Sequence, residues 1–109
     1  ARLATCLYAG LAADTGSFRF GNTRPDTHDL AGRLLATGID HAAISQRLFD
    51  TAPFGWLGLL SVVAGRAVLE AEVGAGLVWT WSSTAEAAEH GLPGEQLEAL
   101  VDVVRSTQE

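Results

Sequence analysis

The sequence predicts a mostly helical α/β chain, in which helices come first and a β-hairpin with two more helices follows. Apolar residues recur at helical spacing through most of residues 3–67. The period changes to two over residues 69–81, where apolar residues stand at alternate positions on either side of a glycine-containing turn. Glycine and proline residues separate the periodic segments and mark where each element ends.

A buried helix is predicted at the start of the chain. Leu3, Leu7 and Leu11 recur at helical spacing with small residues between them, and the helix ends near residues 14–16. A buried strand is the alternative for a run that is this short and apolar. Cys6 lies inside the same run and is predicted to be a buried thiol that packs as a small hydrophobe.

Two more helices are predicted before residue 52. Pro25 suits the first turn of a helix that follows Asn22 or Thr23 and stops at Gly38. Asp40 is the predicted N-cap of the next helix. The inward face of the first is expected to consist of Leu30, Leu34 and Leu35, and that of the second of Ile44 and Leu48.

The segment 53–67 is predicted to be a helix that is apolar around most of its circumference. Its main face consists of Trp56, Leu60, Val63 and Ala67, which Leu57 and Leu59 widen. Such a helix must be covered on more than one side. We therefore expect it either to connect two domains or to pair two copies of the chain, which makes self-association through residues 53–67 an expectation.

A hairpin is predicted after residue 67. Leu77, Trp79 and Trp81 form the apolar face of its second strand. For the two tryptophans a hydrophobic core is favoured over a base-stacking surface, because half-buried strands favour aromatic side chains. An isolated hairpin is only marginally stable, so this part of the chain is expected to continue past Glu109.

Two short helices are predicted after the hairpin. Ser83 and Glu86 have the spacing of a capping box for a helix that stops at Gly91. Pro93 is expected to open the last helix, and the apolar face of that helix is predicted to consist of Leu97, Leu100, Val101 and Val104.

Composition argues against several classes of protein. The longest uncharged stretch, residues 51–65, is shorter than the roughly 20 residues of a membrane-spanning helix. The single cysteine excludes a disulfide within the chain and favours a reducing, cytoplasmic compartment. Residues 53–109 contain two basic and eight acidic residues, which argues against unaided binding of nucleic acid. The sequence contains no methionine, so a missing upstream segment is expected.

One acidic residue carries the functional hypothesis. The apolar residues 7–13 lead the carboxylate of Asp14 into a polar turn that contains Gly16. A lone aspartate before Thr-Gly usually serves the turn itself. A negative charge at the C-terminal end of a helix, however, opposes the helix dipole, and a bound cation would reverse the sign of that effect. Asp14 is therefore the candidate metal ligand.

This motif resembles the last metal-binding motif of the DHH phosphoesterases, in particular the branch that acts on short oligoribonucleotides and phosphoadenosine phosphate. The match is most specific over residues 9–27 and looser as far as about residue 76. The resemblance implies a parent enzyme with paired manganese ions, in which Asp14 supplies one ligand and a missing upstream catalytic segment supplies the others. It also implies that residues 1–52 end the catalytic domain, 53–67 form a linker helix, and 68–109 begin the DHH-associated substrate-binding domain.

Three residues beside Asp14 are candidates for substrate binding. Thr15 and Ser17 could donate hydrogen bonds to a phosphate, although hydroxyls in turns more often bond neighbouring main-chain groups. Arg19 could offer its guanidinium to a phosphate or point into solvent. The histidines lack the spacing of metal ligands and are expected at the surface; they are His28, His41 and His90. Of these, His28 is nearest the motif in the sequence and could line a cleft.

The sequence is thus interpreted as a fragment of a manganese-dependent phosphoesterase that hydrolyses short RNA or a small nucleotide phosphate and is inactive by itself. A cyclic-dinucleotide phosphodiesterase and a polyphosphatase are alternatives within the family. A noncatalytic module that dimerises through residues 53–67 is the alternative from another class.

Overall fold

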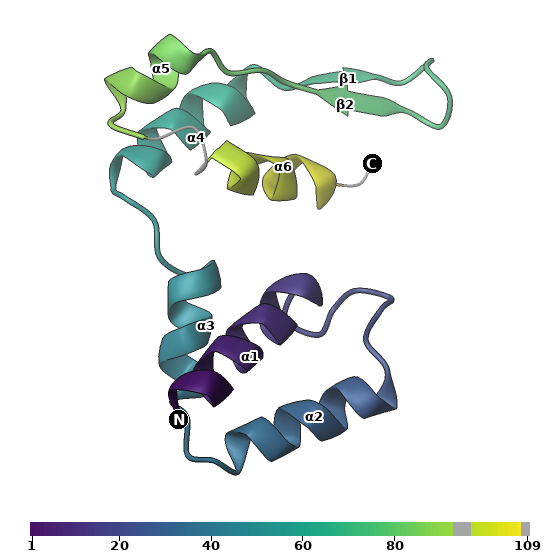
Figure 1. Ribbon diagram of the computed structural model, residues 1–109. Coiled ribbons are helices and arrows are strands. Elements are labelled where there is room, and N and C mark those ends of the chain that lie inside the picture. The colour runs from purple at the N-terminus through teal and green to yellow at the C-terminus, as the bar shows by residue number, and fades with distance from the viewer. Residues whose placement is uncertain (93–96, 108–109) are drawn as a thin grey trace. The chain divides into compact units, whose positions relative to one another are not determined.

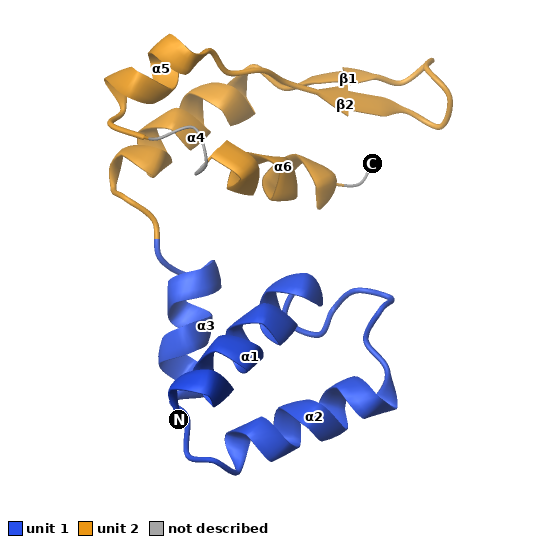
Figure 2. Cartoon of the chain, viewed as in Figure 1, with its two compact units in different colours: residues 1–51 blue, residues 52–109 orange. Residues whose placement is uncertain are grey.

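A computed structural model describes residues 1–92 and 97–107, which form two compact units. Unit 1 comprises residues 1–51 and unit 2 residues 52–109 (Figure 2). Unit 1 contains the helices α1 (Arg2–Asp14), α2 (Pro25–Leu35) and α3 (His41–Phe49). Unit 2 contains α4 (Gly55–Gly65), β1 (Val68–Glu70), β2 (Leu77–Trp79), α5 (Thr84–Glu89) and α6 (Glu98–Arg105) (Figure 1). The predicted fold class, a mostly helical chain with one antiparallel hairpin, is confirmed. No helix among the described residues has the length and apolarity to cross a membrane.

Unit 1 is built around one face of α1, and this face is not the predicted one. Ala4, Tyr8 and Ala12 are buried there against α2 and α3. Leu3 and Leu7 are instead 72% and 51% exposed. The small side chains of the two alanines allow the neighbouring helices to approach α1 closely. The ring of Tyr8 belongs to the same core cluster as Ala31 and Leu34 of α2. Because α1 is apolar on several sides, its leucine period does not identify the inward face.

The thiol of Cys6 is exposed, so the prediction of a buried cysteine is wrong. Cys6 lies between Leu3 and Leu7 in the sequence and on the side of α1 that α2 and α3 leave uncovered.

The caps of α2 and α3 are local and largely predictable. Pro25 is the first residue of α2, and Gly38 has the left-handed φ of 87° expected of a residue that ends a helix. The N-cap is Arg24, not Asn22 or Thr23, and its main-chain N–H donates to the hydroxyl of Thr27. Asp40 caps α3 as predicted, since its carboxylate accepts a hydrogen bond of 3.0 Å from the N–H of Ala43.

The leucine faces of α2 and α3 are less buried than expected. Leu34 belongs to the core and Ile44 packs against it, as predicted. Three other leucines predicted to face inward are about 40% exposed, namely Leu30, Leu35 and Leu48. A unit of three short helices is too small to bury much of its surface, so only the residues at the centre of the helix contacts are shielded from solvent.

Unit 2 packs α4 against α5 and α6. Its core consists of Leu59, Val63, Ala87, Leu92 and Leu100, with Trp56, Leu60 and Leu97 packed around it. The buried side of α4 is centred on Leu59, which is fully buried, whereas the predicted contributors Leu57 and Ala67 are exposed. The helix thus belongs to the core of unit 2. Pro93 lies outside the described residues.

The hairpin pairs β1 with β2 in antiparallel register, with Val68 opposite Trp79 and Leu69 opposite Val78. Residues directly opposite each other share one face of a sheet. Trp79 therefore shares a face with Val68, and Leu69 lies on the other face. Trp79 and Trp81 are 43% and 53% exposed, so the prediction of a buried tryptophan core is wrong for the described residues.

An ion pair joins the end of α4 to α5 inside unit 2. The guanidinium of Arg66 makes two hydrogen bonds with the carboxylate of Glu86, at 2.6 and 2.8 Å, and donates a third to the carbonyl of Trp81 at 3.1 Å. The ring of Trp81 lies 4.0 Å from the guanidinium carbon, a cation–π contact. Glu86 also closes the predicted capping box with Ser83. Hydrogen bonds from Arg66 and from the main chain of Ser83 lower the pKa of Glu86 to about 2.

Candidate functional site

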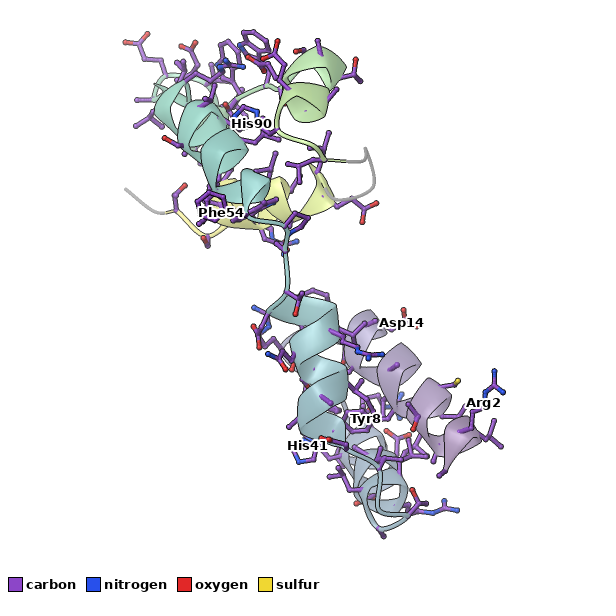
Figure 3. The ribbon with its side chains drawn as sticks, turned by 90° about the vertical axis from the view of Figure 1, so that its left-hand side faces the viewer. Arg2, Tyr8, Asp14, His41, Phe54 and His90 are labelled. Carbon is purple, nitrogen blue, oxygen red and sulfur yellow. The ribbon has the colours of Figure 1, made fainter. Side chains whose placement is uncertain are left out.

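Asp14 is the last residue of α1, and its side chain is exposed. Figure 3 shows it at the opposite end of this helix from Arg2. Within residues 1–92 and 97–107, no hydrogen bond or ion pair is found for its carboxylate. The adjacent C-terminal carbonyls of α1 carry partial negative charge, so a bound cation would be favoured electrostatically at this carboxylate.

The main chain of Asp14 is held by a contact that the sequence did not reveal. The side-chain amide of Asn22 donates a hydrogen bond of 3.0 Å to the Asp14 carbonyl and so closes the intervening turn. Asparagine commonly bonds main-chain groups in turns, but the local sequence does not show that its partner lies eight residues upstream.

The turn that follows Asp14 has an unusual backbone. Gly16, Ser17 and Phe18 all have left-handed φ angles, of 57°, 58° and 66°. Glycine adopts this conformation freely, whereas a residue with a side chain incurs a cost of about 1–2 kcal/mol. Strained backbone of this kind persists only where surrounding contacts hold it, and it is frequent at functional sites.

Thr15 is one of those contacts. It is buried, and its hydroxyl donates to the carbonyl of Leu11 at 2.8 Å and accepts from the N–H of Phe18 at 3.0 Å. The hydroxyl therefore bonds the main chain on both sides of the turn. In this structure it stabilises the turn and does not face outward toward a substrate.

Aromatic packing supports the turn from α1 and α2. The ring of Phe18 lies 5.1 Å from that of His28, in a stacked arrangement, and 6.3 Å from that of Tyr8. The centre of the His41 ring lies 6.4 Å from that of the Tyr8 ring, in an edge-on arrangement (Figure 3). Phe18, with its left-handed φ, is thus packed between the rings of Tyr8 and His28.

The histidine predictions are only partly correct. His28 and His41 are exposed, as expected. His90 is half-buried, its Nδ1 lies 2.8 Å from the carbonyl of Glu86, and its ring and main chain lie close to Gly58 and Gly55 of α4. His90 thus serves the packing of unit 2.

Arg19 and Ser17 are exposed polar side chains of the turn. The Nε of Arg19 donates to the carbonyl of Gly16 at 2.6 Å, and its guanidinium carbon lies 5.9 Å from the centre of the Phe20 ring. The Nε contact orients the guanidinium and leaves its two terminal nitrogens to meet an anion. The carboxylate of Asp14, the hydroxyl of Ser17 and the guanidinium of Arg19 are thus all exposed at the end of α1 and in the turn that follows it.

The described residues do not by themselves fit a manganese centre. No group of three or more histidine, cysteine, aspartate or glutamate side chains within them is arranged to hold a metal ion. Asp14 offers the oxygen donors of a single carboxylate, and a hard divalent cation needs several more.

Comparisons with known proteins give two informative matches, although no family model matches the chain. The chain is 40% identical over 67 residues to the bifunctional oligoribonuclease and PAP phosphatase NrnA of Thermus thermophilus, which covers 59% of the chain and 21% of that protein. A crystal structure of an exopolyphosphatase-related protein from Bacteroides fragilis aligns with 96% of the chain and 30% of its own length, with a TM-score of 0.81 and 22% identity.

The structural match shows the fold alone, and the sequence match shows similarity to a part of its relative. The chain spans about a fifth of the length of the curated relative it matches. Both matches support the resemblance found in the sequence, and the chain is similar to a segment of the DHH-family phosphoesterases.

Proposed function

We propose that this segment supplies Asp14 as one metal ligand to a manganese-dependent phosphoesterase whose substrates are short oligoribonucleotides or small nucleotide phosphates such as phosphoadenosine phosphate. One observation carries the proposal: an exposed carboxylate without a partner among the described residues stands at a helix C-terminus, in front of a turn held in strained geometry. The 40% identity to a bifunctional oligoribonuclease and PAP phosphatase supports this substrate class. The proposal places the enzyme in the cytoplasm.

The residues of the turn have distinct parts in this proposal. Asp14 binds the cation through its carboxylate, and the bond from Asn22 fixes the main chain beside it. Arg19 and Ser17 face a phosphate oxygen, the first as a charged donor and the second through its hydroxyl. Paired divalent ions, when bound, activate a water molecule and neutralise charge on the phosphate. The remaining ligands come from the upstream catalytic segment, so the isolated chain is inactive.

The test is to replace Asp14 by Asn in the longer parent protein. We expect hydrolysis of a short oligoribonucleotide to fall by roughly a hundredfold or more, because a metal-bound carboxylate is lost. Since the substitution removes a negative charge from a helix C-terminus, the variant should keep its stability or gain a few tenths of a kcal/mol. Loss of activity together with loss of folding would not support the proposal.

Asp50 provides the matched control. It is the exposed C-cap residue of α3, so Asp50→Asn removes the same charge from the same kind of helix end. We expect the Asp50 variant to retain full activity. Equal activity of both variants and the wild type would refute the role of Asp14. Parallel assays with polyphosphate and with cyclic and linear dinucleotides distinguish the alternative substrates within the family.

The noncatalytic alternative is favoured by one observation. Phe54 and Leu57, in the segment 53–67, are 88% and 57% exposed. An assembly module that pairs through this segment predicts a dimer of the isolated chain that Leu57→Gln converts to a monomer. A monomeric wild-type chain would exclude it.

A further inference from the structure

Two phenylalanines flank Arg19 in the turn after α1, and their surroundings differ. Phe18 packs against the core cluster of unit 1. Phe20 lies outside the core cluster that the described residues of this unit form, and it is 42% exposed. A single exposed phenylalanine is ordinary on a protein surface and needs no functional explanation. The position of this ring relative to Gly16 and Arg19 is what sets it apart.

The ring of Phe20 lies directly against the main chain of Gly16. A Cβ atom added at Gly16 would lie 2.4, 2.5 and 2.7 Å from three carbon atoms at the tip of this ring, which is closer than real contacts allow. Gly16 is accordingly buried, although Ser17 beside it is exposed. Glycine is therefore required here for two reasons, the left-handed φ of 57° and the space that the ring occupies.

Arg19 is held by the same glycine. Its Nε donates to the carbonyl of Gly16 at 2.6 Å, and its guanidinium carbon lies 5.9 Å from the centre of the Phe20 ring. This separation is at the outer limit of a cation–π contact. It is also wider than the separation of about 3.5–4.0 Å between carbon atoms in direct contact. The turn thus presents a cation and an aromatic ring side by side, both exposed and both held through Gly16.

This pair of groups suits the chemistry of a nucleotide. A guanidinium recognises the phosphate, as proposed for Arg19. An aromatic ring at the surface stacks on a base, and it does so with little sequence preference because every base has a π-face. A polyphosphate has no base and would use the guanidinium alone. The ring of Phe20 therefore bears on which class of substrate the turn accepts.

We propose that Phe20 is a stacking platform for the base of the nucleotide whose phosphate meets Arg19. This inference rests on the proposed function, in which Arg19 contacts the phosphate, and it adds a site for the base. The platform takes purines and pyrimidines alike, since stacking involves no hydrogen-bond readout of the base. Among the alternative substrates it favours nucleotides over polyphosphate.

The test compares two ligands that differ by the presence of the base, adenosine monophosphate and the corresponding ribose phosphate. Their dissociation constants for the longer parent protein are measured by NMR titration without added divalent cations. We expect the wild type to bind adenosine monophosphate about fivefold more tightly, or better. Phe20→Leu should abolish this preference and leave the binding of ribose phosphate unchanged. Equal affinities in the wild type, a preference that survives in Phe20→Leu, or no binding of either ligand would overturn the proposal.

Phe49 supplies the matched control. It is the last residue of α3, belongs to the same unit and is also 42% exposed. Phe49→Leu should keep the wild-type preference, and its loss in this variant as well would refute a site at Phe20. If Phe20→Leu binds neither ligand but melts at the wild-type temperature, then Phe20 holds the turn and the stacking role is wrong.

Arg19→Gln separates this inference from the proposed function. It should weaken the binding of both ligands by the same factor and keep the preference for the base. Unchanged binding of both ligands would overturn the phosphate contact of Arg19 and its pairing with Phe20. The metal-binding role of Asp14 does not enter these titrations, because they contain no added divalent cation. Its failure would appear in the hydrolysis assay of Asp14→Asn and leave the preference for the base intact.

Discussion

Gly55 is predicted to be indispensable for the packing of α4 against the end of α5. A Cβ atom added at Gly55 would lie 2.0 Å from the main-chain carbonyl oxygen of His90. Carbon and oxygen need about 3.3 Å, so the two segments would have to separate by more than about 1 Å. Because the obstacle is main chain, no side-chain rotation relieves the clash. The fully buried Leu59 lies one turn further along α4, so separation would also loosen the core.

The expected cost of Gly55→Ala follows from two opposing effects. Overpacking of this kind destabilises by about 1–3 kcal/mol, and the better helix propensity of alanine returns up to about 1 kcal/mol. A net loss of about 1–2 kcal/mol corresponds to a melting temperature lower by about 5–15 °C in a unit of this size. All three tryptophans lie in unit 2, so thermal unfolding followed by tryptophan fluorescence reports on this unit alone.

Gly65 supplies the control for this prediction. It is the last residue of the same helix, and nothing lies within 4 Å of an added Cβ. Gly65→Ala should therefore leave the melting temperature unchanged or raise it. A Gly55→Ala variant as stable as Gly65→Ala would refute the close approach of α4 to His90.

Two further predictions concern the ion pair and the strained turn. The pKa of Glu86 is lowered from 4.5 to about 2, so its contribution to the stability of unit 2 is present above pH 4.5 and is lost as the pH falls toward 2. Urea unfolding monitored by tryptophan fluorescence should show this loss in the wild type and a flatter profile in Glu86→Gln; identical profiles would contradict it. Ser17→Gly should stabilise unit 1 by a few tenths to about 1 kcal/mol, because glycine adopts the φ of 58° without strain. Ser45→Gly within α3 should destabilise it, and circular dichroism measures both; a destabilised Ser17→Gly would argue against the left-handed turn.

The elements that depend on local sequence were predictable. The capping aspartate at position 40 and the capping box of Ser83 with Glu86 agree with the structure. Gly38 has the left-handed φ expected after a helix end, although α2 itself ends at Leu35. In each case the interacting groups lie within a few residues of one another. Such signals depend on hydrogen-bonding and backbone preferences of single residues and need no knowledge of the tertiary fold.

The buried faces of the apolar helices were not predictable by the same means. Leu3 and Leu7 have the period of a core stripe, yet the inward residues of α1 are Ala4, Tyr8 and Ala12. Periodicity identifies a helix, but a helix that is apolar on several sides offers several such stripes. The choice among them depends on which side its neighbours occupy, and α2 and α3 select the face where alanine allows close contact.

The candidate site combines both kinds of information. The position of Asp14 at a helix end followed from the local pattern, as did the polar turn after it. The left-handed conformation of Ser17 and Phe18 did not, because both residue types normally avoid it. In this conformation Phe18 packs against the ring of His28 from α2 and that of Tyr8 from α1, which are contacts between elements.

This dependence assigns unit 1 a part in the proposed chemistry beyond the supply of one carboxylate. The turn after Asp14 is held by hydrogen bonds from within α1 and by aromatic packing that includes α2, so its geometry exists once these helices have packed. Asn22 then fixes the main chain of Asp14 from the far end of the turn. Because the main chain of Asp14 is fixed, a cation that binds its carboxylate needs to order only the side chain, which lowers the entropic cost of binding. The strain stored in Ser17 and Phe18 is therefore understandable as the cost of holding Asp14 and Arg19 ready on one short turn.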